Sequence, residues 1–121
     1  MKVAVLGASS KPERYSYMAV KMLAEKGHVV FPIHPTLAEI DGIPVFKRLA
    51  DIPGPVHTVT VYLGPERSAA LAEEILAAKP TRVIFNPGAE NPELARRLQA
   101  EGAGPVNACT LVMLKTNQFG D

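Results

Sequence analysis

The sequence predicts an α/β fold, a Rossmann-like three-layer sandwich around a five-stranded, mainly parallel sheet. Short apolar segments of strand length alternate along the chain with longer segments whose apolar residues recur at helical spacing. Gly and Pro fall mostly between these segments, where they mark turns. Because strands that alternate with helices usually run parallel, we expect helices on both faces of the sheet.

The first half of the chain predicts two strands joined by a helix. Apolar residues recur at helical spacing at Met18, Ala19, Met22 and Leu23, and Gly27 follows as a helix stop. The short apolar runs on either side of this helix are typical of buried strands. In order, the residues predict a strand at 3–6, a helix at 15–26, a strand at 28–33, a turn with a short extended piece at 40–46 and a helical turn at 48–52.

The second half predicts three more strands, each followed by a helix. Thr58 begins a run rich in β-branched residues, and Pro65 suits the first position of the helix after it. Gly102 is a natural stop for the next helix. In order, the residues predict a strand at 58–63, a helix at 66–78, a strand at 82–85, a helix at 92–100, a short strand at 105–108 and a helix at 109–115.

Composition predicts one folded, soluble domain over residues 1–121. The chain is 47% hydrophobic and 21% charged, as ordinary globular proteins are. Its net charge of +1 gives no reason to expect binding to nucleic acid or to a membrane surface. We recognise neither a signal peptide nor a long apolar run. Cys109 is the single cysteine, which excludes an internal disulfide and fits a reducing cytoplasm.

The turns that follow the strands are the expected place for a ligand. In an open parallel sheet, ligands bind beyond the carboxyl ends of the strands. Gly and Ser in these turns let backbone N–H groups approach a ligand closely. The turns are at 7–11, 34–35, 63–65 and 86–88.

The first turn has the residues of a phosphate cradle. Gly7 permits a tight departure from the strand, and Ser9 and Ser10 offer hydroxyl donors. The helix that follows offers unpaired N–H groups and the positive end of its dipole. Lys11 and Arg14 can add formal charge. The alternative is a plain loop with a Ser cap and solvated cations.

The second turn disfavours a dinucleotide. A site for NAD normally has an acidic residue at the end of the second strand, where it binds the ribose, and here the residues are His34 and Pro35. Glu39 and Asp41 come too late in the chain. His34 is either a catalytic base, a group that stacks on a ligand, or a loop residue that hydrogen-bonds the backbone.

Neither a catalytic constellation nor a metal site is predicted. The three histidines and Cys109 share no metal-ligand spacing. His28 and His57 are expected at strand starts, on the edge away from the turns. Cys109 begins an apolar helical segment, where a buried and inert thiol is the ordinary outcome.

Three groups of residues resemble a known family. The first is Gly7-Ala8-Ser9 with Lys11-Pro12-Glu13-Arg14 and Ser16. The second is 32–35 with 41–45 and 49–53, and the third is Asn107-Ala108-Cys109. Together these segments resemble the small stand-alone CoA-binding proteins, which are relatives of the CoA-binding domain of succinyl-CoA synthetase. The chain departs from the family pattern at His34, at Asn86-Pro87-Gly88 and at Ala108, where Asn, a turn with Gln, and Arg are usual.

The resemblance implies a Rossmann-like domain that binds coenzyme A across the strand ends. It implies phosphate contacts from the first turn and the helix start, which are Gly7, Ala8, Ser9, Ser10, Lys11, Arg14, Ser16 and Tyr17. It implies that the nucleotide and the next wall are bordered by Ile33, His34, Pro35, Leu63, Gly64 and Arg67. It implies a pantetheine arm near Asn86, Pro87 and Gly88.

Three functions are therefore open. The leading hypothesis is non-catalytic binding of coenzyme A or an acyl-CoA. The first alternative is an NAD(P)-type nucleotide-dependent oxidoreductase with His34 as its acid–base group. The second is an interaction protein whose site no longer binds. The apolar residues 111–114 cover either the core or a face for a homodimer or an unknown protein partner.

Overall fold

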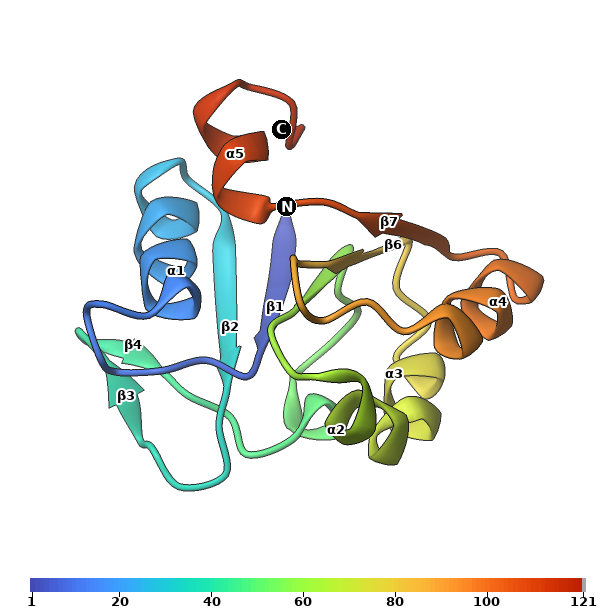
Figure 1. Ribbon diagram of the computed structural model, residues 1–121. Helices are drawn as coiled ribbons and strands as arrows, with labels where there is room; N and C mark the ends of the chain where they lie inside the picture. The colour runs from blue at the N-terminus through green and yellow to red at the C-terminus, as the bar shows by residue number, and fades with distance from the viewer. Residues whose placement is uncertain (121) are drawn as a thin grey trace.

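The computed structural model describes residues 1–120 and has a five-stranded sheet with helices on both faces (Figure 1). Every pair of neighbouring strands is parallel, in the order β2-β1-β5-β6-β7. The strands are β1 (Lys2–Leu6), β2 (Val29–Ile33), β5 (Thr58–Val61), β6 (Arg82–Phe85) and β7 (Gly104–Asn107). The predicted α/β, Rossmann-like fold is confirmed.

The strand order divides the helices between the two faces. From β1 the chain first crosses to β2, and it later returns to place β5 on the other side of β1. Because parallel crossovers are right-handed, the reversal moves the helices to the opposite face. Accordingly α1 (Tyr15–Glu25) and α5 (Thr110–Lys115) lie on one face, and α2 (Pro65–Ala70), α3 (Ala72–Ala77) and α4 (Pro92–Ala100) on the other (Figure 1).

Strand β1 shows how one short segment serves two cores. Val3 and Val5 face α1 and α5, where they pack with Leu23. Ala4 and Leu6 face the other way, into the core under α3 and α4. These four residues are buried, because side chains alternate across a strand and this sheet is covered on both sides. Within the described residues, no helix is long and apolar enough to cross a bilayer.

The prediction of a single helix at 66–78 is wrong, because the segment forms two helices that meet at Leu71. The amide of Leu71 donates to the carbonyl of Ser68, which is a tighter bond than the α-helical one. The Ser68 hydroxyl donates back to the carbonyl of Pro65, at 3.3 Å. The Asn91 side chain donates to the same carbonyl at 3.3 Å and to the Ser68 hydroxyl at 2.9 Å. These hydrogen bonds from Asn91 lie at the break between α2 and α3. The spacing of apolar residues within one segment could not predict them, because they join distant parts of the chain.

The extended piece expected at 40–46 is a small hairpin outside the main sheet. It pairs β3 (Glu39–Ile40) with β4 (Ile43–Pro44), and a 3-10 turn follows at Leu49–Asp51. Asp41 and Gly42 form the connection, both at positive φ. Asp-Gly is a typical pair for a two-residue hairpin turn. The remaining elements begin and end within two residues of their predicted bounds.

Gly7 brings the ends of β1 and β5 together. Its φ is 91°, in the left-handed region that favours glycine. A Cβ on Gly7 would lie 2.9 Å from Leu63 Cδ2 and 3.4 Å from the carbonyl carbon of Tyr62. The turn after β1 therefore lies directly against the turn after β5, with no room for a side chain between them.

We expect Gly7→Ala to lower the free energy of unfolding by about 2–4 kcal/mol. The variant places a Cβ on a residue with a left-handed φ, and this Cβ also clashes with Leu63. Urea denaturation measures the loss. Gly27→Ala is the matched control, since Gly27 has φ 88° and nothing within 4 Å of an added Cβ. That variant is expected to lose only about 1–2 kcal/mol. Equal losses in the two variants would show that the contact with Leu63 is unimportant.

Candidate functional site

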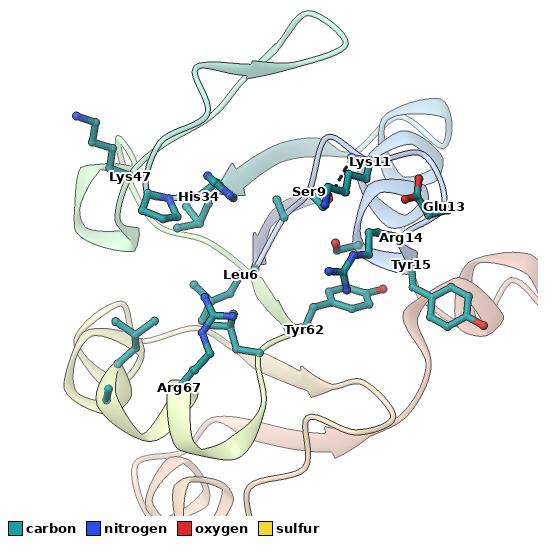
Figure 2. Close-up of a pocket in the computed structure, with 18 of the residues that line it drawn as sticks. Leu6, Ser9, Lys11, Glu13, Arg14, Tyr15, His34, Lys47, Tyr62 and Arg67 are labelled. Carbon is teal, nitrogen blue, oxygen red and sulfur yellow. Dashed lines mark hydrogen bonds between the residues drawn. The ribbon is translucent and has the colours of Figure 1, made fainter.

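A groove of about 920 Å³ lies at the carboxyl edge of the sheet. Its residues come from the ends of β1, β2 and β5 and from the starts of α1 and α2 (Figure 2). This is the switch point of the sheet, where the chain leaves β1 in one direction and β5 in the other. Open α/β sheets bind ligands at such points.

The groove gathers most of the residues that the sequence singled out. They come from four separate turns and from two helix starts, so the fold brings distant segments to one place. The predicted residues that line it are Gly7, Ala8, Ser9, Lys11, Arg14, Ser16, Ile33, His34, Pro35, Leu63, Arg67 and Pro87. Their role in binding stays a prediction.

The start of α1 presents free donors to this groove. No side chain caps the helix, and its first turn contains no acidic residue. The first amides of a helix have no acceptor within the helix, so they are available to an anion. Ser9 Oγ accepts from the amide of Lys11 at 3.1 Å, which fixes the turn and leaves the Ser9 O–H free to donate. The amide of Ala8 is already used, since it donates to the carbonyl of Ile33.

Four cationic side chains line the groove, and none has a partner within residues 1–120. Three cations elsewhere on the surface are paired: Lys21 with Asp41, Arg48 with Glu74 and Arg97 with Glu73. Among the described lining residues, Glu13 is the one carboxylate. The groove therefore carries excess positive charge. Its cations are Lys11, Arg14, Lys47 and Arg67.

His34 is held in one orientation by the backbone after β2. The amides of Thr36 and Leu37 each donate to its Nδ1 at 3.1 Å. A nitrogen that accepts carries no proton, so the neutral ring holds its proton on Nε2. His34 is thus the loop histidine that was one of its three alternatives, and it also lines the groove, where it can donate from Nε2.

Tyr17 faces away from the groove. Its hydroxyl donates to the Asp41 carboxylate, and Lys21 Nζ lies 3.1 Å from the same carboxylate. The hydrogen bond from Tyr17, with that from Lys21, holds the pKa of Asp41 below its usual value. These contacts tie α1 to the β3–β4 hairpin, so the predicted phosphate contact from Tyr17 is not supported.

Four other predicted residues do not line the groove. Ser10 is exposed, and Gly64 precedes α2 as its N-cap. The amide of Gly88 donates to Glu90 Oε1 at 2.9 Å. Asn86 is buried, with 2% of its surface exposed. Of the turn at 86–88, Pro87 is therefore the residue that lines the groove.

Asn86 fastens three elements together under the groove. Its Nδ2 donates to Thr60 Oγ1 at 2.7 Å and to the carbonyl of Val61 at 2.9 Å. Its Oδ1 accepts from the amide of Thr110 at 2.9 Å. The side chain thus joins β6 to β5 and to the start of α5, and none of its donors is left for a ligand.

We expect Asn86→Ala to lower the free energy of unfolding by about 2–4 kcal/mol, because it leaves buried donors and acceptors unpaired. Chemical denaturation measures this loss. Asn107→Ala, at an exposed asparagine on edge strand β7, is the control and is expected to lose less than about 0.5 kcal/mol. A small effect at Asn86 would argue against its structural role.

Sequence reasoning missed Lys47, Tyr62, Glu13 and Tyr15 as lining residues. The position of Tyr62 could have been predicted, because side chains alternate along a strand and Tyr62 continues the series of Thr58 and Thr60 on one face of the sheet. Its buried hydroxyl has no hydrogen-bond partner within residues 1–120. The nearby hydroxyls of Thr60 and Thr110 bond to each other at 2.8 Å. Burial raises the pKa of Tyr62 from 10.0 to about 12.

The raised pKa of Tyr62 predicts a loss of stability in alkali. From pH 10 the unfolded state loses this proton while the folded state keeps it, so stability falls as pH rises from 10 towards 12. Tyr62→Phe lacks this dependence, and we expect the stability difference between the two proteins to change by about 2 kcal/mol. Urea denaturation at pH 9 to 12 measures it. Identical pH profiles would contradict the raised pKa.

The fold and the groove define an α/β domain with a cationic groove at the switch point of its sheet. A profile of the CoA binding domain family matches residues 1–115. The chain belongs to this family of CoA-binding domains, as the resemblance implied.

Relatives extend over most of the chain. It is 31% identical to the uncharacterized protein YneT of Bacillus subtilis (strain 168), over 84% of this chain and 75% of YneT. An uncharacterized protein of known crystal structure is 41% identical, with a TM-score of 0.91 over 98% of this chain and 97% of that one. The alpha subunit of the ADP-forming acetate–CoA ligase II of Pyrococcus furiosus is 36% identical over 62 residues, which are 50% of this chain and 14% of the subunit.

Proposed function

We propose that this chain is a non-catalytic binding protein for coenzyme A or an acyl-CoA, which it holds in the groove at the switch point. The observation that carries the proposal is the set of unpartnered cations around the uncapped start of α1. Helix N-termini and unpaired cations favour phosphate groups. Membership of the CoA-binding domain family supports coenzyme A as the source of those phosphates.

The diphosphate of coenzyme A is proposed to lie over the first turn. The α1 amides and the Ser9 hydroxyl donate from the floor, and Lys11 and Arg14 add charge from the rim. Arg14 can bind two phosphate oxygens at once, because its guanidinium is a planar fork of donors. Gly7 keeps this turn close against the end of β5, where Leu63 fills the space that a side chain would take.

The oxidoreductase alternative has less support. The end of β2 offers His34 and Pro35 where NAD needs an acceptor for its ribose hydroxyls. The Nδ1 of His34 is occupied by two backbone amides, so it is not free to take a proton from a substrate.

We also propose a cytoplasmic location for the protein. Its single cysteine, Cys109, agrees with a reducing compartment.

Calorimetric titration with CoA and with NAD tests the proposal. We expect CoA to bind, and Lys11→Ala and Arg14→Ala each to weaken it by about tenfold or more, since each removes a charged phosphate contact. Arg96→Ala is the control, because Arg96 is exposed on α4 and does not line the groove. It is expected to bind CoA as the wild type does.

Two results would overturn the proposal. Tight binding of NAD without binding of CoA would favour the oxidoreductase. A melting temperature that millimolar CoA and NAD both leave unchanged would favour the interaction protein, because a ligand that binds only the folded state must stabilise it.

A further inference from the structure

Helices α1 and α5 leave part of their face of the sheet open to solvent. Within residues 1–120 two helices lie on this face, whereas three lie on the other. The large apolar residues that are exposed on this face are Tyr15, Met18, Val106 and Val112. Val106 belongs to it because its register partner Ile84 lies in the core under α1 and α5. Parallel sheets are normally covered on both faces, so this face lacks part of its cover.

Three of these residues form one surface across the two helices, which pack against each other. Tyr15 is 70% exposed at the start of α1, and Figure 2 shows its ring beside the segment that leads into α5. Met18 is 36% exposed on α1, and Val112 is 54% exposed on α5. We call the surface of Tyr15, Met18 and Val112 the α1–α5 face. Its composition is typical of a protein interface, because interfaces are enriched in Tyr and Met.

The two edges of the sheet are poorly suited to pairing with another chain. In β2 the amide of Val29 donates towards β1, so alternation turns the nitrogen of Pro32 away from the sheet. In β7 the amide of Gly104 donates towards β6, so the nitrogen of Pro105 also faces outward. Proline has no N–H, so each edge lacks a donor that an added strand would need. A second chain is therefore expected on the α1–α5 face rather than beside the sheet.

Two opposite charges flank the α1–α5 face. Glu25 lies two turns after Met18 on α1, and Lys115 lies one turn after Val112 on α5. Both charged side chains are exposed, and neither forms an ion pair within residues 1–120. Both lie at the carboxyl ends of their helices, and the two helices run in similar directions (Figure 1). The face thus carries a negative and a positive group at the same end.

We propose that a second copy of this chain docks on the α1–α5 face and forms a two-fold dimer. An axis along the strands lays α1 of one copy against α5 of the other, with the helices still running in similar directions. Glu25 of one copy then lies opposite Lys115 of the other, and symmetry makes this pair twice. The face is therefore complementary to itself, which favours a second copy over an unrelated partner. The dimer goes beyond the proposed function and does not depend on it.

Sedimentation equilibrium of the full chain at about 1 to 500 μM tests the dimer. We expect the mass to rise with concentration from 13.0 kDa towards twice that value. Val112→Lys is expected to weaken the dimer about tenfold or more, because symmetry buries the added charge twice. Val29→Lys is the matched control and is expected to leave the dimer unchanged. Val29 is 52% exposed, and alternation along β2 places it on the opposite face with Phe31.

An exchange of charges tests the two-fold arrangement. Glu25→Lys and Lys115→Glu are each expected to weaken the dimer about tenfold, because each places like charges opposite one another. The double variant restores both pairs with their signs exchanged, so it is expected to dimerise as the wild type does. Circular dichroism of each variant checks that its fold is unchanged.

Three results would overturn the proposal. A chain that stays monomeric at every concentration leaves the face to a different partner. A dimer that Val112→Lys does not weaken is formed through another surface. A double variant that is as weak as the single variants contradicts the pairing of Glu25 with Lys115. None of these results bears on the binding of CoA, which the calorimetric titration tests separately.

Discussion

The contact between the turn after β1 and the turn after β5 is the constraint on which the groove depends. A ligand site at the switch point needs these two turns to leave the sheet in opposite directions while their backbones still touch. Gly7 makes this possible, because its left-handed φ turns the chain away at once and its missing side chain admits Leu63. With the turns fixed, α1 starts on one side of the groove and α2 on the other. The helix ends, and the charges near them, then follow from the strand order.

The molecule separates the polar groups that hold the fold from those that face the groove. Asn86 and Thr110 are buried and fully engaged, so they join strands and helix beneath the site. Asp41 is exposed, yet it joins the hairpin to α1 through Tyr17 and Lys21. The cations of the groove make no such bonds within residues 1–120. Their charge is therefore available to the proposed ligand.

Local pattern was sufficient for the sheet and for most of the groove. The periodicity of apolar residues within each segment predicts the strands and helices. The first turn is also predictable, because its Gly, Ser, Lys and Arg residues all lie within residues 7–14. The misses depend on contacts between distant segments. Lys47 reaches the groove because Phe46 bridges to Ile33 at the end of β2. Asn86 and Tyr17 have partners 24 to 26 residues away, which turn candidate ligand contacts into structural bonds.

The freedom of the groove's cations has an evolutionary consequence. An exposed side chain without a structural partner can be replaced at little cost in stability. Ligand preference at this site can therefore drift by single surface substitutions, while Gly7 and Asn86 keep the scaffold unchanged. Such a scaffold suits a family whose members share one architecture and differ in the molecule that they hold. The charged rim would then be the first part to diverge between two copies of the gene.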